Sequence, residues 1–184
     1  MRRSTTICGL LLALAGLVTA TAASATRTAA RPSVATREAV VLYMRDIMRY
    51  SRETRYWQHV IGERLSPPPS EARGALAPTT LRRLDARWRH REQAVSRRAQ
   101  HPPHRRAWMC IHRYEASWDD PLGPYYGGLQ MDLSFQRAYG GWLLRRKGTA
   151  DHWTPLEQIW TAEKAFTTRG FYPWPNTARA CGLL

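Results

Sequence analysis

One acidic side chain stands in a pattern that could carry out proton-transfer chemistry. Trp108, Ile111 and Glu115 follow one another at i, i+3 and i+7, so on a helix they share one face. A glutamate on a face that packs inward is costly to ionise, and its pKa is expected to rise. That protonation state is the one a general acid needs near neutral pH. The alternative is a buried structural carboxylate.

An aromatic, glycine-rich loop follows this candidate acid. Tyr125-Tyr126 precedes Gly127-Gly128, and adjacent glycines let a backbone approach a ligand or adopt positive φ. Some aromatic residues lie in expected loops and are hard to explain as core: Trp118, Tyr125, Tyr126, Tyr172 and Trp174. Aromatic faces beside Gln and Asn amides bind sugar rings. Nucleic-acid bases also stack on aromatic side chains, so the pattern alone leaves both ligands open.

Other titratable groups favour structural interpretations. Glu163 lies on an apolar helical stripe between Ile159 and Phe166, and we expect it to be buried and satisfied by a backbone N–H or an arginine. His101 and His104 flank two prolines, without a Cys or acidic ligand nearby in sequence. We therefore expect no metal site there and no cofactor.

The first 25 residues match a secretory signal peptide. Met1-Arg2-Arg3 is basic, residues 7–18 are apolar, and Ala23-Ser24-Ala25 fits a cleavage site. The apolar run is shorter than the roughly 20 residues that span a bilayer. An uncleaved anchor is the alternative. We expect cleavage near Ala25, a secreted or cell-wall-associated protein, and no stable membrane span after cleavage.

Export would leave Cys110 and Cys181 as an even pair in an oxidising compartment, once Cys8 is removed. A disulfide between them would close a loop of about 70 residues, typically worth about 2–4 kcal/mol. Two free buried thiols are the alternative.

The net charge of +14 belongs mainly to the N-terminal half. Residues 26–107 carry 18 Lys and Arg against 7 Asp and Glu, whereas residues 108–184 carry 8 against 7. Inside a cell, nucleic acid would be the default partner of such a half. For an exported protein, anionic wall polymers or lipid headgroups fit better. The plainer interpretation is a solvated cationic helix face.

Helical periodicity and stop signals predict a mainly α protein. In the basic half, Thr36 is expected to cap a helix that starts at Arg37 and reorients beyond Met48. The proline run at residues 66–70 is expected to be a stiff linker, followed by a helix from Thr79 or Thr80.

In the second half, one helix is expected from Arg105 to about Ser117. Ser134 is expected to cap a short helix that ends at Gly140-Gly141, followed by a turn or two of helix at residues 142–147. The sharpest local signal is Thr154-Pro155-Leu156-Glu157, a capping box with proline at the first helical position.

Residues 106–184 resemble a known family. The pattern Trp108-x-x-Ile111-x-x-x-Glu115, then Trp118, then Tyr125-Tyr126-Gly-Gly-Leu-Gln130 is similar to the catalytic domain of the resuscitation-promoting factors. Further matches are Pro155-x-Glu157-Gln158-Ile159, Ala162-Glu163-Lys164, and Trp174-Pro175 ahead of Cys181-Gly182. The resemblance does not reach residues 26–105.

The resemblance implies a small lysozyme-like, transglycosylase-type domain at residues 106–184 that acts on peptidoglycan glycan strands. The family's single catalytic glutamate falls on Glu115. The substrate groove would be lined by loop and helix residues: Trp118, Tyr125, Tyr126, Gln130, Asp132, Trp142 and Trp174. Domain organisation would then be a signal peptide at 1–25, a basic helical region at 26–105, and this domain.

Two features depart from the family. Tyr114 stands where a Cys usually precedes the catalytic Glu, and Cys110 lies one helical turn earlier. The partner Cys normally follows Trp-Pro within a residue or two, but here residues 176–180 intervene. Both ends have moved, so the resemblance still implies a Cys110–Cys181 bridge. The loop after Glu115 also differs, with Ala116-Ser117-Trp118 in place of a Gly-containing stretch.

The implied chemistry is cleavage of the β-1,4 bond between N-acetylmuramic acid and N-acetylglucosamine, with Glu115 as acid. Ordinary glycosidases need a second carboxylate. The candidates are Asp119, Asp120, Asp132 and Asp151, and Asp132 is favoured by its position near Gln130. Without one, the sugar's N-acetyl group can assist and the 6-hydroxyl can attack, giving a 1,6-anhydro end. We slightly prefer this lytic transglycosylase route over water attack.

Two other function classes stand beside this one. A non-catalytic wall-binding protein would keep the groove and cleave nothing. A secreted nucleic-acid binder is disfavoured, because the basic half lacks interleaved loop aromatics.

Overall fold

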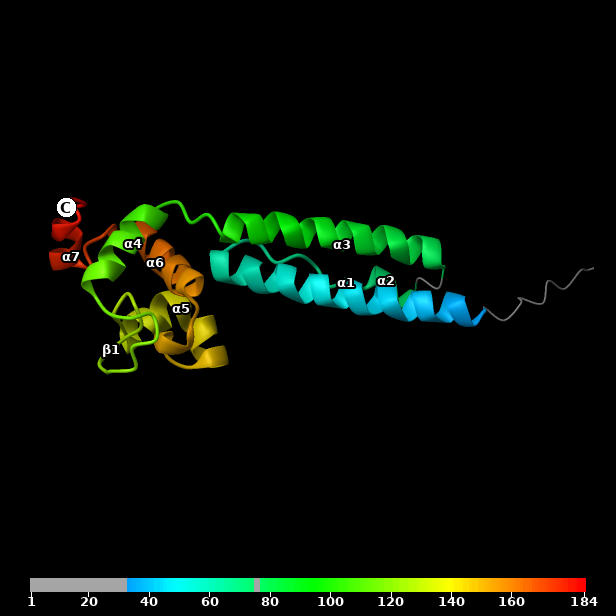
Figure 1. Cartoon of the computed structure of the whole chain (residues 1–184), viewed down its shortest axis with the longest axis horizontal. Helices are drawn as coiled ribbons and strands as arrows, with labels where there is room; N and C mark the ends of the chain where they lie inside the picture. Colours follow the sequence, from blue (N-terminus) through cyan, green and yellow to red (C-terminus); the bar gives the residue numbers. More distant parts are fainter. Residues whose placement is uncertain (1–32, 75–76) are drawn as a thin grey trace, which may run out of the picture. The chain divides into compact units, whose positions relative to one another are not determined.

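A computed structural model of the chain describes residues 33–74 and 77–184, so the predicted signal peptide at residues 1–25 lies outside the described residues. The mainly α class is confirmed, since helices dominate and strands are few (Figure 1). The helices are α1 (Val34–Ile61), α2 (Glu71–Gly74), α3 (Pro78–Ala99), α4 (Arg105–Tyr114), α5 (Leu133–Lys147), α6 (Pro155–Arg169) and α7 (Pro175–Ala180). A 3-10 turn covers Ala150–His152, and β1 (Tyr125–Tyr126) pairs antiparallel with β2 (Met131–Asp132).

Helix α1 runs without interruption for 28 residues, so the expected reorientation beyond Met48 is wrong. The cap is Ser33, whose side chain accepts from the Thr36 N–H, and not Thr36 itself. The inward stripe does become polar in the second half of the helix, yet it stays buried. Gln58 is an example. Its Oε1 accepts from the Ser66 backbone N–H at 2.7 Å and its Nε2 donates to the Ser66 hydroxyl at 3.0 Å, so both ends of the buried amide have a hydrogen-bond partner.

Helices α1 and α3 run side by side in the same direction (Figure 1). The proline-rich segment after α1 is not helical, as predicted. It runs back alongside α1 toward α2 (Figure 1). Near the beginning of α3, Leu81, Leu84 and Trp88 pack on Ile47. Beyond the end of α1, Glu63 accepts hydrogen bonds of 2.6 and 2.7 Å from Arg98.

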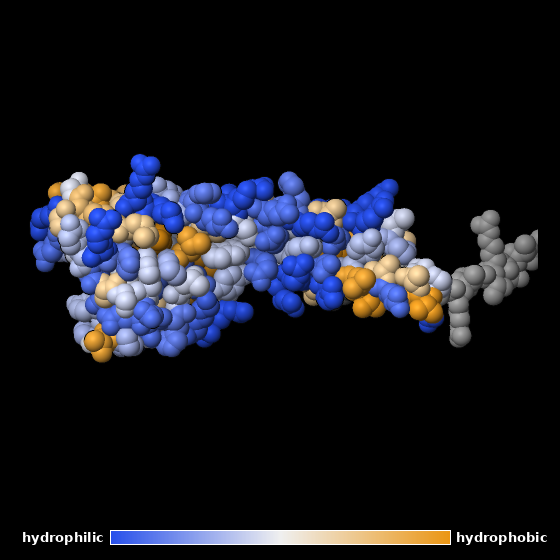
Figure 2. Space-filling view, viewed as in Figure 1, coloured by the Kyte–Doolittle hydropathy of each residue, from blue (hydrophilic) through white to orange (hydrophobic). Residues whose placement is uncertain are grey.

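The outer surfaces of α1 and α3 are mostly hydrophilic, with hydrophobic side chains near the start of α1 (Figure 2). Val41 is the most exposed of these, at 66%. Many of the arginines are engaged in ion pairs, including Arg87 with Glu71, Arg89 with Asp85 and Arg98 with Glu63. The cationic face of this region is therefore partly neutralised by its own carboxylates.

A second core lies between α4, α5, α6 and the short strands. Val60 of α1 belongs to this core. The other members include large apolar side chains: Trp108, Ile111, Leu129, Met131, Leu143, Trp153, Ile159 and Trp174. Residues Ser33–Leu184 form one compact unit. The boundary near residue 105 stays a prediction. No helix within residues 33–74 and 77–184 is both long enough and apolar enough to cross a membrane.

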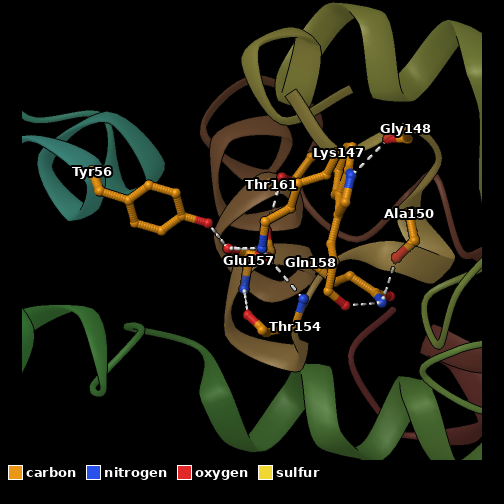
Figure 3. Close-up of polar contacts among 9 residues, drawn as sticks. Tyr56, Lys147, Gly148, Ala150, Thr154, Glu157, Gln158 and Thr161 are labelled. Atoms are coloured by element: carbon orange, nitrogen blue, oxygen red, sulfur yellow. Dashed lines mark hydrogen bonds and ion pairs between the residues drawn. The ribbon is translucent and has the colours of Figure 1, made fainter. Parts of the chain in front are cut away.

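The predicted capping box at the start of α6 is confirmed. Thr154 Oγ1 accepts from the Glu157 N–H, and Glu157 Oε2 accepts from the Thr154 N–H at 2.7 Å. Glu157 is buried and also bonds the Lys147 ammonium at 2.7 and 2.8 Å and the Tyr56 hydroxyl (Figure 3). This one carboxylate thus caps α6 and joins it to α5 and α1. As expected, the helix ends at Gly170.

Helix α5 differs from the expectation at its start and agrees with it in the middle. Its cap is Asp132, whose Oδ1 accepts from the Phe135 N–H at 2.7 Å, so the expected Ser134 cap is wrong. At Gly140 the backbone leaves helical geometry (φ −122°, ψ 17°), and a second helical segment continues to Lys147, which confirms the expected break followed by a further turn or two of helix. A Cβ on Gly140 would lie 2.5 Å from the Trp153 ring, so the glycine also allows close packing at the break.

Candidate functional site

Glu115 lies just past the end of α4, not within it. The helix stops at Tyr114, and Glu115 is its C-cap with φ −95° and ψ −98°. The expected continuation to Ser117 is therefore wrong. Trp108 and Ile111 are fully buried as expected, and the ψ angle of Glu115 redirects the chain that follows it. Glu115 is half-buried, so its carboxyl can reach solvent.

A pocket of about 220 Å³ surrounds the Glu115 carboxyl. Its walls come from the β1–β2 hairpin and the segment around α7: Tyr125, Gln130, Pro173, Trp174, Pro175, Asn176 and Thr177. Three of the predicted site residues besides Glu115 therefore meet here, namely Tyr125, Gln130 and Trp174. Among the described residues, Glu115 is the only carboxylate that lines this pocket.

Thr177 holds the Glu115 carboxyl. Its hydroxyl donates to Glu115 Oε1 at 2.8 Å and lies 3.5 Å from the Trp174 carbonyl oxygen. Burial raises the pKa of Glu115, and the hydrogen bond from Thr177 lowers that pKa in part. Within the described part of the chain, no Lys, Arg or His forms an ion pair with this carboxyl. Desolvation by the protein therefore dominates its titration.

The disulfide between Cys110 and Cys181 is present. It links α4, which leads into Glu115, to the residue that follows α7, which carries Thr177. The two sides of the Glu115–Thr177 hydrogen bond are thus covalently joined about one turn from each residue.

Tyr125 and Gln130 frame the pocket from the hairpin. Tyr125 is 50% exposed, so a ring face is available to a ligand. Gln130 adopts φ 48°, and its amide donates to Asp120 Oδ2 at 2.8 Å and to the Gly127 carbonyl at 3.0 Å. Trp174 is almost fully buried and donates from Nε1 to the Leu129 carbonyl at 2.6 Å. These internal bonds hold the pocket walls in place without a ligand.

The paired glycines serve internal packing. Gly127 has φ 72°, and a Cβ there would lie 2.6 Å from Oε1 of the Gln158 amide. A Cβ on Gly128 would meet Trp118 and His112 at 2.6 and 2.7 Å. Gly127 thus confirms the positive-φ alternative of the expectation, and close approach of a ligand to this backbone stays a prediction.

Four predicted groove residues lie outside the pocket lining. Trp118 stacks on His112 at 3.9 Å between ring centroids, and Tyr126 packs on the core. Trp142 packs on Tyr56 and His59 of α1. Asp132 caps α5, and hydrogen bonds from the Phe135 N–H and the Ser134 hydroxyl hold its pKa below the usual range.

The other candidate carboxylates lie outside the pocket lining. Asp120 accepts from Gln130 and from the Leu122 N–H, and Asp119 is exposed. Asp151 lies against His152 through Oδ2, and its Oδ1 is buried without a hydrogen-bond partner among the described residues. Glu163 is buried and accepts from the His104 N–H at 2.7 Å, which confirms its structural interpretation.

Within the described residues, no three His, Cys, Asp or Glu side chains gather as a metal site would require. Four residues of the pocket lining were not predicted as site residues: Pro173, Pro175, Asn176 and Thr177. Asn176 and Thr177 lie in the segment that departs from the family pattern, where no spacing rule points to Glu115.

No protein-family model, curated protein or solved structure matches this chain. The likeness to the resuscitation-promoting factors rests on the residue pattern in 106–184 alone.

Proposed function

We propose that this protein is an exported enzyme that cleaves peptidoglycan glycan strands, with Glu115 as its single general acid and base. The observation that carries the proposal is one half-buried carboxyl with a raised pKa, alone among carboxylates in a pocket of aromatic and amide groups. A raised pKa keeps the carboxyl protonated closer to neutral pH, as proton donation requires. The resemblance supplies the substrate class and a lysozyme-like fold for residues 106–184.

In the first step, the Glu115 carboxyl donates its proton to the oxygen that bridges N-acetylmuramic acid and N-acetylglucosamine. The bond from the anomeric carbon to that oxygen breaks, and the N-acetylglucosamine leaves as an alcohol. The electron-poor anomeric carbon needs a nucleophile. Since Glu115 is the only carboxylate of residues 33–74 and 77–184 that lines the pocket, the carbonyl oxygen of the sugar's own N-acetyl group is the candidate that best suits the site.

In the second step, the ionised Glu115 takes the proton from an attacking hydroxyl. If the 6-hydroxyl of the same sugar attacks, it displaces the N-acetyl oxygen and leaves a 1,6-anhydro end. If water attacks, the product has a reducing end and the enzyme is a muramidase. The described part of the chain places no second carboxylate in the pocket lining, which favours the first route, because water attack normally uses one.

Thr177 suits both charge states of the acid. A hydroxyl can donate and accept, so Thr177 can donate to the carboxylate or accept from the carboxylic acid. In the second case its own proton can turn toward the Trp174 carbonyl, 3.5 Å away. Thr177 is therefore proposed as a positioning residue that holds Oε1 in place through the proton transfer.

The alternative is a wall-binding protein without activity. The pocket favours it in one respect, because about 220 Å³ is smaller than the roughly 300–1,000 Å³ of most ligand sites. Such a protein would keep Tyr125 and Gln130 as sugar contacts and use Glu115 only as an acceptor. Attraction of anionic wall polymers by the arginines of α1 and α3 remains part of either proposal.

Loss of turbidity of purified cell walls separates the two functions. The wild-type protein is expected to clear the suspension, and Glu115→Gln is expected not to, because an amide cannot donate an acidic proton. Asp119→Asn is the matched control, since it removes an exposed carboxylate outside the pocket, and it should clear like wild type. Sedimentation with walls but no clearing by the wild type would favour the binding protein. Equal clearing by wild type and Glu115→Gln would exclude the role given to Glu115.

A further inference from the structure

A larger groove of about 880 Å³ lies along the outer face of α4. Helix α4 turns Trp108 and Ile111 into the core and presents Arg105, Met109 and Arg113 outward. The groove is completed by the preceding loop and by the disulfide region: His101, Pro102, Pro103, His104, Arg106, Ala107, Cys110, Cys181 and Leu183. None of its lining residues borders the Glu115 pocket.

The charge of this groove is of one sign. Arg105, Arg106 and Arg113 are exposed, and none of them forms an ion pair with a described carboxylate. No Asp or Glu among the described residues lines the groove. Glu163 contacts His104 from below, but it is buried and both its oxygens are bonded to that residue. Arg82, Arg83 and Arg91 of α3 also form no ion pair with a described carboxylate, but they do not line this groove.

The N-terminus of α4 adds donors at the same end of the groove. No side chain caps this helix among the described residues. The Arg105 N–H already donates to the Pro102 carbonyl at 3.2 Å, which leaves the N–H groups of Arg106 and Ala107 for an anion, and the helix dipole favours negative charge there. Arg106 and Ala107 belong to this first turn and line the groove.

The groove is too long for one small anion. Arg105 and Arg113 are eight residues apart on one helix, or about 12 Å at 1.5 Å per residue. A chain with repeated negative charges can contact both guanidinium groups with a separate charge at each, without the two side chains having to converge on one point. The floor is aliphatic and sulfur-containing, from Met109, the Cys110–Cys181 bridge and Leu183, with no Trp, Tyr or Phe among the lining residues. A ligand that depends on base stacking is therefore disfavoured.

We propose that this groove binds an extended phosphodiester polymer without bases, such as a polyol phosphate chain. Phosphodiesters stay charged at working pH, and two free oxygens on each can accept from a guanidinium fork and from helix N–H groups together. This binding requires no cleavage by Glu115. Loss of binding here and loss of the proposed enzyme activity are therefore separate results.

The test is binding of purified poly(glycerol phosphate) to the full, disulfide-bonded chain, measured by calorimetry at several salt concentrations. The groove variant is Arg105→Gln/Arg106→Gln/Arg113→Gln. Its matched control is Arg82→Gln/Arg83→Gln/Arg91→Gln, which removes the same charge from exposed positions on α3. The groove variant is expected to bind at least about tenfold more weakly. Its plot of log K against log salt should lose about 2 from its slope, as each contact to a flexible polyanion contributes about 0.7.

The control is expected to lose less than about threefold, since only long-range attraction is removed. Equal losses in the two variants, or a larger loss in the control, would overturn the groove as the site. Two further probes of matched charge are a single-stranded oligothymidine and polygalacturonate. Tighter binding of either than of poly(glycerol phosphate) by the wild type would overturn the phosphodiester assignment, in favour of nucleic acid or of a carboxylate polymer.

Discussion

The Thr177 hydroxyl donates a 2.8 Å hydrogen bond to Oε1 of Glu115, across 62 residues of sequence. The pair is held from behind by the Cys110–Cys181 bridge, which joins α4 to the end of α7. A carboxyl with a single fixed partner has a defined orientation and keeps one oxygen free. That arrangement suits a group that must give a proton to a ligand and then take one back.

Removal of the Thr177 hydroxyl should raise the pKa of Glu115. The hydrogen bond favours the ionised form, so Thr177→Val leaves burial unopposed, whereas Thr177→Ser restores the bond. A carbon-13 NMR titration of the Glu115 carboxyl measures this directly. If Glu115 acts as the acid, the alkaline limb of the pH–activity profile should move upward with it. An unchanged pKa in Thr177→Val would show that this hydrogen bond does not stabilise the ionised Glu115 carboxylate in solution.

Glu115 should make folding stability fall as pH rises through its folded-state pKa. Burial raises that pKa above the unfolded value, so the folded state favours the protonated carboxyl. The contribution is fully present below the unfolded pKa and is lost above the folded one. Glu115→Gln, which resembles the protonated form, should therefore gain Tm relative to wild type at pH 8 but not at pH 3.5. Equal differences at both pH values would argue against a raised pKa.

Loss of the disulfide should destabilise the protein and impair the site together. Its cysteines are 71 residues apart, and a bridge of that kind contributes about 2–4 kcal/mol. Urea unfolding of the Cys110→Ser/Cys181→Ser variant measures the loss against wild type. At low temperature, where the variant stays folded, wall clearing should still fall, because Thr177 is no longer tethered to Glu115. Full clearing by the folded variant would show that the tether is only structural.

Asp132 should be dispensable for chemistry. Its carboxylate is committed to the cap of α5, so Asp132→Asn should keep wall clearing close to wild type, since Asn also caps helices well. Asp132→Ala should cost about 1 kcal/mol of unfolding free energy through loss of the cap. A fall in clearing of about 10²-fold or more for Asp132→Asn, with unchanged stability, would restore Asp132 as the second catalytic carboxylate.

Features decided within one turn of helix were predictable from the sequence. The Thr154–Glu157 capping box and the Gly170 stop depend on residues four or fewer positions apart, and both are present. The even pair of cysteines that remains after the predicted signal peptide also indicated the bridge, which is present. The end of α4 was not predictable, because residues 115–117 contain no Gly or Pro that would mark a helix end.

Contacts between distant segments decided the remaining differences. The stripe of α1 turns polar at Ser51, Thr54 and Gln58, which suggested a reorientation, but Ser66 of the proline-rich segment satisfies Gln58. Asp132 was predicted to face the groove, but in the structure its side chain caps α5. The contact of Thr177 with Glu115 could not be predicted, because nothing in the sequence of residues 175–180 indicates which part of the chain they pack against.

The most direct test of the central proposal is a count of new glycan ends released from purified peptidoglycan, by mass spectrometry of the soluble fragments. Wild type should release fragments with new ends, mainly 1,6-anhydro, and Glu115→Gln should release at least about 10²-fold fewer, the lower range of general acid catalysis. Release at the wild-type rate by folded Glu115→Gln would contradict the account.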